Sequence, residues 1–178
     1  MRYAGIIFDD TAAAPGLCLS FYTQGCPIHC PGCHNPETWN EEGGYEFTGD
    51  TMDRILKGIT KNGVTRSFAI LGGEPLSPHN LFLTAMVVQS VRDHYPDIPL
   101  WVWSGYTMEE IISMNSSPHM RSVFAKVDAI VAGPFVQELR DISLPYVGSS
   151  NQKVFLLDHE KKVCYNKENE TEEYKLNV

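Results

Sequence analysis

The sequence contains no long hydrophobic run. One of the longer apolar stretches in its 178 residues covers only residues 81–88, far short of the ~20 residues that a membrane-spanning helix needs. The first ten residues, MRYAGIIFDD, also lack the basic segment followed by an apolar segment that marks a secretory signal. We therefore expect a cytoplasmic protein with no membrane partner.

Positive charge is scarce as well. Lys and Arg number 14 against 22 Asp and Glu, so the formal net charge is −8 and the pI is near 5.2. Within residues 1–50 the only Lys or Arg is Arg2, whereas seven acids are present. Proteins that bind nucleic acid without sequence preference rely on Lys and Arg against phosphates. The composition therefore argues against a nucleic-acid partner.

The chain is too short for a closed eight-fold β/α barrel, which takes about 250 residues. Predicted strands cover residues 3–8, 17–22, 67–71, 100–103, 127–132 and 153–157. Predicted helices cover residues 51–63 and 77–94, and two shorter ones begin at Thr107 and at Ser117. This alternation predicts an α/β fold, an open or partial β/α barrel of about five to six mostly parallel strands.

We expect one core domain over residues 1–157. Residues 158–178 are mostly polar and predict a solvated tail, with a small hairpin around residues 163–165.

Unusual residues follow four of the predicted strands. These tracts are TQGCPIHCPGCHN after 17–22, GGEP after 67–71, SGY after 100–103 and GPF after 127–132. In β/α folds the residues that bind ligands and carry chemistry lie at the carboxyl ends of the strands. We therefore expect these tracts to border one site.

Three of the five cysteines lie within eight residues, spaced C-x3-C-x2-C at Cys26, Cys30 and Cys33. An odd number of cysteines, with three of them in one loop, does not fit a disulfide framework. Three thiolates on one loop are able to hold three corners of a [4Fe–4S] cluster and leave one iron free for a ligand. The alternative is a structural Cys3His zinc site, with His29 or His34 as the fourth ligand. Cys18 and Cys164 lie outside the motif, and we expect neither to be a ligand.

This cysteine motif, followed about 40 residues later by Gly72-Gly73-Glu74-Pro75, resembles the radical S-adenosylmethionine superfamily. The resemblance implies a [4Fe–4S] cluster held by the three cysteines. It also implies S-adenosylmethionine on the open iron, with its amino group against residues 72–74. Superfamily motifs often have an aromatic residue just before the last cysteine, where this chain has Gly32.

Within that superfamily, residues 15 to 157 resemble the family of glycyl-radical activases that act on anaerobic ribonucleoside-triphosphate reductase. The segments that carry the resemblance are PGLCLSFYTQGCPIHCPGCHNPETW, GGEPLSPHN, PLWVWSGYTMEEI, VDAIVAGPFVQELRD and GSSNQKV. Family members often carry an acid where this chain has Ala132, so no role is transferred to that position.

The family resemblance implies an oxidoreductase that cleaves S-adenosylmethionine reductively and forms a glycyl radical on the reductase, with flavodoxin as the expected electron donor. No catalytic acid or base is required. The implied cluster ligands are Cys26, Cys30 and Cys33, and the implied cofactor-binding residues are Gly32, His34, Asn35, Gly72, Gly73, Glu74, Ser104 and Gly133.

Three further expectations concern the side walls and the rival functions. Asn151 and Gln152 are candidates to hydrogen-bond adenine or the partner, whereas Trp101 and Trp103 are expected in the core. The rival functions are another small radical enzyme, such as pyruvate formate-lyase activase or a deazaguanine synthase, and a zinc-stabilised binding module. A zinc module needs no ligand-binding glycines, so the GGEP tract disfavours it.

Overall fold

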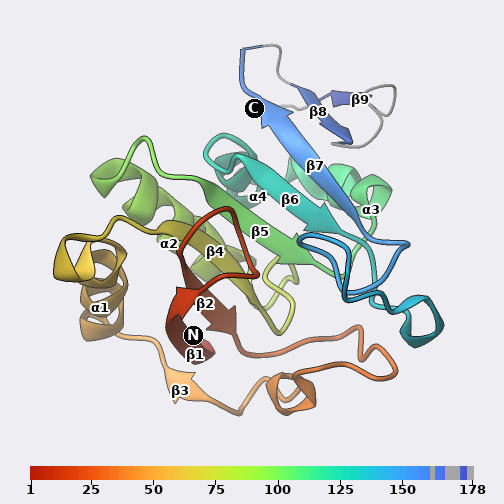
Figure 1. Cartoon of the computed structure of the whole chain (residues 1–178), viewed down its shortest axis with the longest axis horizontal. Coiled ribbons are helices and arrows are strands. Elements are labelled where there is room, and N and C mark those ends of the chain that lie inside the picture. Colours follow the sequence, from red (N-terminus) through yellow and green to blue (C-terminus); the bar gives the residue numbers. More distant parts are fainter. Residues whose placement is uncertain (161–162, 167–172, 176–178) are drawn as a thin grey trace.

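The central four strands of the sheet are parallel. The computed structural model describes residues 1–160, 163–166 and 173–175, and it forms one open sheet in the order β3-β1-β2-β4-β5-β6-β7-β8-β9 (Figure 1). The parallel strands are β2 (Cys18–Thr23), β4 (Ser67–Gly72), β5 (Leu100–Ser104) and β6 (Ala129–Ala132). Their carboxyl ends therefore lie along one edge of the sheet, as the tract pattern predicts.

Antiparallel strands flank this centre on both sides. They are β1 (Arg2–Asp10), β3 (Tyr45–Glu46), β7 (Lys153–Asp158), β8 (Val163–Asn166) and β9 (Glu173–Lys175). The prediction of five to six mostly parallel strands was therefore wrong, because only three of the eight strand pairings are parallel. A parallel pair needs a crossover of a dozen or more residues, and the β1–β2 and β7–β8 connections are too short for one.

Helices connect the parallel strands, and capping boxes begin two of them, α1 and α3. They are α1 (Gly49–Ile59), α2 (Leu81–His94), α3 (Met108–Ser113) and α4 (Pro118–Phe124), with 3-10 turns at Pro36–Thr38, Lys61–Gly63, Met114–Ser116 and Gln137–Leu139. The predicted capping box of Thr107 and Glu110 is confirmed. Helix α2 begins at Leu81 instead of Ser77, because the side chain of Asn80 bonds to the carbonyls of Gly25 and Glu74.

The sheet is covered by apolar side chains on both faces. One cluster joins the helices to residues such as Phe68, Ile70 and Val102, which are fully buried. The other face carries a smaller cluster that contains Cys18 and Trp101. Strands β2, β4, β5 and β6 therefore consist almost entirely of buried residues, as parallel strands covered on both sides do.

The end of the chain extends the sheet. Strand β8, which contains the predicted hairpin residues 163–165, pairs with β7 and β9, and the ring of Tyr174 packs edge-on against Phe155 at 5.8 Å. The expected hairpin is therefore present at residues 163–166, and its strands extend the main sheet. Residues 161–162, 167–172 and 176–178 of the predicted tail, and the side chain of Cys164, lie outside the described residues.

Among the described residues, no helix combines the length and the apolar character needed to cross a membrane.

Candidate functional site

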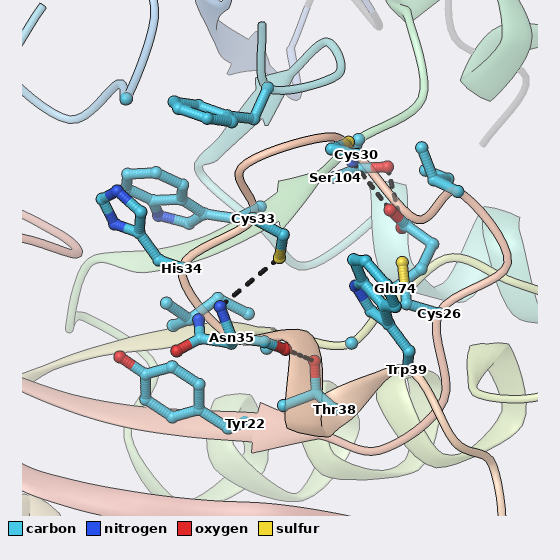
Figure 2. A pocket seen from close by; sticks show the side chains of 18 of the residues that line it. Tyr22, Cys26, Cys30, Cys33, His34, Asn35, Thr38, Trp39, Glu74 and Ser104 are labelled. Atoms are coloured by element: carbon cyan, nitrogen blue, oxygen red, sulfur yellow. Dashed lines mark hydrogen bonds between the residues drawn. The ribbon is translucent and has the colours of Figure 1, made fainter. Parts of the chain in front are cut away.

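The carboxyl ends of the parallel strands border a cavity of about 350 Å³. Its walls come from the loop after β2, the turn after β4, the end of β5 and the segment after β6, as the tract pattern predicts. The lining residues are Tyr22, Cys26, Ile28, Cys30, Cys33, His34, Asn35, Thr38, Trp39, Leu71, Gly72, Gly73, Glu74, Trp103, Ser104, Gly105, Phe135, Gly148 and Gln152. Figure 2 shows side chains of this lining around the hollow.

The three motif cysteines lie on one loop whose ends are held by backbone hydrogen bonds. The amides of Gly25 and Cys26 donate to the carbonyls of Thr38 and Trp39, at 2.7 and 3.1 Å. The amide of Cys33 donates to the carbonyl of Cys30 and closes a turn, in which Gly32 has a φ of +72°. This left-handed conformation favours glycine and brings the second and third cysteines round to the same cavity.

All three thiols are free, half-buried and surrounded by N–H donors. The amide of Asn35 donates to Cys33 Sγ at 3.4 Å, and backbone groups of Ile28 and His29 bond to Cys26 (Figure 2). Burial raises the pKa of both Cys26 and Cys30. Hydrogen bonds from backbone amides to sulfur are among the features that tune iron–sulfur clusters.

In the described part of the chain, these thiols are not placed as the ligands of a single zinc ion would be. A tetrahedral zinc with Zn–S bonds of ~2.3 Å draws its ligand sulfurs to within about 3.8 Å of one another. No three His, Cys, Asp or Glu side chains in the described part of the chain are placed to hold one metal ion. In a cubane cluster each thiolate binds its own iron, so its thiolates stand further apart.

Glu74 is the one acidic residue that lines the cavity, and its pKa is strongly raised. It is 1 % exposed, and its carboxylate accepts hydrogen bonds from the amide of Leu76, the hydroxyl of Ser104 and the amide of Gly105 at 2.9, 2.8 and 2.7 Å. Burial raises its pKa to about 7, against the lowering effect of these donors. Its carboxylate therefore joins the turn after β4 to the end of β5.

The two glycines before Glu74 are required by the packing of the cysteine loop. Gly72 has a φ of +100°, and a Cβ at Gly73 would stand 2.4 Å from the carbonyl oxygen of Gly25. The amides of Gly73 and Glu74 donate to the carbonyls of Thr23 and Gly25, both at 2.9 Å. The turn after β4 and the start of the cysteine loop are thus in backbone contact.

Comparison with known proteins also indicates an iron–sulfur protein. Residues 12–155 match the model of the 4Fe-4S single cluster domain. A protein of Vibrio cholerae serotype O1 named anaerobic ribonucleoside-triphosphate reductase-activating protein is 31% identical over 155 residues, which cover 86% of this chain and 97% of the relative. The protein of that name from Escherichia coli K12 is 34% identical over the same shares. The chain belongs to this family.

A less similar member of the activating-protein family also matches this chain over most of its length. The protein of that name from Enterobacteria phage T4 is 29% identical over 155 residues, which cover 87% of this chain and 94% of its own. The family match includes every strand from β2 to β6 and therefore every tract that borders the cavity.

Most of the residues implied by the family resemblance line the cavity, but two do not. Gly32 and Gly133 are absent from its walls. A Cβ at Gly32 would meet the side chain of Gln137, while the amide of Gly133 donates to the carbonyl of Tyr106 and its carbonyl accepts from the Gln152 side chain. Both glycines therefore allow the loops around the cavity to fold closely, and neither lines the cavity itself.

Sequence reasoning missed part of the cavity wall. Trp39 and Trp103 line it, although Trp103 was expected in the core, whereas Phe135 lines it as the position of the GPF tract predicts. Trp39 stacks on His29 with ring centroids 4.6 Å apart. Of the pair Asn151 and Gln152 only the latter lines the cavity, and its amide already bonds to Gly133 and Gly148. The position of Trp103 as the second-last residue of β5, beside SGY, was the available signal.

Proposed function

We propose that the chain is a radical S-adenosylmethionine oxidoreductase that activates anaerobic ribonucleoside-triphosphate reductase. The observation that carries the proposal is the meeting of three thiols, the Gly-Gly-Glu-Pro turn and the Ser104 tract around one cavity, in a member of the activating-protein family. The open sheet is then the partial barrel of that superfamily.

The proposed ligands of the [4Fe–4S] cluster are Cys26, Cys30 and Cys33, with S-adenosylmethionine in the same cavity against residues 72–74. Bound there, a cluster reduced by the external electron donor would supply one electron to the sulfonium of S-adenosylmethionine, and this chemistry would yield methionine and a 5′-deoxyadenosyl radical. That radical would take a hydrogen atom from a glycine Cα of the reductase, giving 5′-deoxyadenosine and a glycyl radical. Such chemistry belongs to the cofactors, and the protein binds, orients and shields them.

The described residues carry those protein roles. Three aromatic side chains, Trp39, Trp103 and Phe135, give the walls an apolar character that excludes water. The Glu74 carboxylate holds the turn after β4 against β5 through Ser104 and Gly105. No acid–base pair is needed, in agreement with a wall in which Glu74 is the one carboxylate and is saturated by donors.

The partners and the compartment follow from the same proposal. The reductase is the protein substrate, and a low-potential protein such as flavodoxin is the electron donor. We expect the activity in the cytoplasm, where thiols are kept reduced.

The test replaces one proposed ligand. Anaerobically reconstituted wild-type protein is expected to be brown and, with a strong reductant, to release methionine and 5′-deoxyadenosine. Cys30→Ser should abolish that cleavage, because one iron loses its thiolate. Cys18→Ala is the matched control, since Cys18 is fully buried in β2 and does not line the cavity. Mixing with the reductase should give a glycyl-radical signal in electron paramagnetic resonance.

Two results would overturn the proposal. One is a colourless protein that retains a single tightly bound zinc and does not cleave S-adenosylmethionine. The other is a glycyl radical that forms on pyruvate formate-lyase but not on the reductase.

A further inference from the structure

A second hollow, of about 560 Å³, adjoins the cavity and plays no part in the proposed chemistry. We call it the rim groove. Its floor and walls include Thr11, Arg140, Ile142, Leu144, Tyr146 and Val147. Most of these residues belong to the connection between β6 and β7, which Figure 1 shows on the same side of the sheet as the loop after β2.

The rim groove and the cavity share a wall. His34, Trp103 and Gly148 line both hollows. A chain segment lying in the groove would therefore lie against His34 and Trp103, which also line the cavity. The groove is thus next to the proposed cofactor site.

The groove is built on a braced loop. Arg140 and Ser149 form a backbone bridge, the amide of Ser150 donates to Leu139 at 2.9 Å, and Asp141 accepts from both the amide and the hydroxyl of Ser143. The ring of Tyr146, a residue with a φ of +61°, lies 4.9 Å from that of Trp101. The left-handed conformation is costly for tyrosine, and the surrounding contacts maintain it.

This loop carries exposed apolar side chains and one arginine. Ile142 is 85 % exposed and Leu139 is 44 % exposed; Leu139 directly precedes Arg140, and Asp141 separates Arg140 from Ile142. The guanidinium of Arg140 has no hydrogen-bond or ion-pair partner among the described residues, and no Asp or Glu lines the groove. Arg140 is therefore the one Lys, Arg, Asp or Glu that lines the groove, while Glu138 and Asp141 lie on the same loop outside its lining.

We propose that the rim groove binds an extended segment of the reductase next to its target glycine. One apolar side chain of that segment packs on Ile142 in the groove and on Leu139, which lies outside the lining and directly precedes Arg140, and one acidic side chain pairs with Arg140. This inference rests on the proposed function, because that function requires a protein backbone to enter the cavity. An exposed Ile beside an unpaired Arg is the combination that a partner buries at the centre of an interface.

The experiment compares the binding of the partner with the cleavage of S-adenosylmethionine. Purified reductase is titrated anaerobically against reconstituted wild-type protein, Ile142→Ser and Arg140→Gln, and the dissociation constant is measured by calorimetry. Each substitution is expected to weaken binding about tenfold and to raise the KM for reductase to match. Reductant-driven cleavage without the reductase should stay within about twofold of wild type.

A third test variant with its matched control, and the salt dependence of binding, test the inference further. Leu139→Ser and Val64→Ser remove side chains that are equally exposed, at 44 %, but Val64 precedes the amino end of β4, the far edge from the site. Only Leu139→Ser should weaken binding. Wild-type binding should weaken more steeply with salt than that of Arg140→Gln.

Unchanged binding in both groove variants would overturn the inference. So would an equal loss of cleavage without the reductase, since the groove would then hold the cofactor. Failure of the wild-type protein to cleave S-adenosylmethionine contradicts the proposed function instead, and the binding titration still decides on the groove.

Discussion

At the scale of single residues, Glu74 combines burial with a raised pKa. Its carboxylate is 1 % exposed, and three donors from two neighbouring segments surround it. Burial raises its pKa from 4.5 to about 7. The folded state therefore binds more protons than the unfolded state between these two pH values, and the stability of the protein must fall as the pH rises through that window.

The variant Glu74→Gln tests this linkage in the iron-free protein. Between pH 4.5 and pH 7.5, the free energy of unfolding of the wild-type protein should fall relative to that of the variant, by about 3 kcal/mol in total. The variant lacks the titrating group, so its own curve omits this contribution. Urea unfolding followed by circular dichroism at several pH values measures the difference. Parallel curves for the two proteins would contradict the raised pKa.

At the scale of elements, the site depends on the contact between two loops. The turn after β4 donates two backbone hydrogen bonds to the start of the cysteine loop, and Asn80 adds a third to the carbonyl of Gly25. Backbones approach this closely only where no Cβ intervenes, as at Gly73. The Gly-Gly-Glu-Pro tract thus positions the cysteines, whatever further contact it makes with a cofactor.

The substitution Gly73→Ala should push these loops apart. The added methyl group meets backbone instead of a flexible side chain, so we expect a loss of about 1–3 kcal/mol in the free energy of unfolding and reduced iron retention after reconstitution. Gly5→Ala is the matched control, because a Cβ there has no atom within 4 Å. Iron content per chain and urea unfolding measure both effects. Equal iron content in the two variants would show that the contact is dispensable.

At the scale of the whole molecule, one buried arginine holds the first strand and the first helix to the sheet. Arg66 is 4 % exposed and donates to the carbonyls of Phe8, Gly58, Lys61 and Val64, besides pairing with Asp9 at 2.6 Å. These acceptors come from β1, α1 and the turn that follows α1. The planar guanidinium serves segments far apart in sequence because its donors point in several directions.

The substitution Arg66→Lys should lower the free energy of unfolding by about 2–4 kcal/mol. Lysine keeps the charge but offers three donors on one nitrogen, so several buried carbonyls lose their partner. Arg54→Lys is the control, since Arg54 is exposed and makes one long hydrogen bond to Tyr3, and we expect it to change stability by less than about 0.5 kcal/mol. Chemical unfolding measures both. Similar losses in the free energy of unfolding for the two variants would contradict this account of Arg66.

Local sequence signals predicted much of the fold and part of the site. The capping box at Thr107 and the strand that ends at Ser104 depend on neighbouring residues, and both were predictable. The antiparallel direction of β7 and the start of α2 were not, because they depend on contacts between distant segments, such as that of Asn80 with Gly25. The walls formed by Trp39 and Trp103 were missed for the same reason.

The amino-acid sequence alone specifies the chemistry that this protein has available: three cysteines at cluster spacing, glycines before Glu74, and strand ends at which these tracts meet. Residue type and short-range spacing suffice for that, because backbone conformation and ligand chemistry are local properties. The fold in three dimensions sets which side chains share a wall, that the Glu74 carboxylate joins the turn after β4 to the end of β5, and that a groove with Arg140 and Ile142 lies beside the cavity. Those features arise from packing between distant segments, which no local pattern specifies.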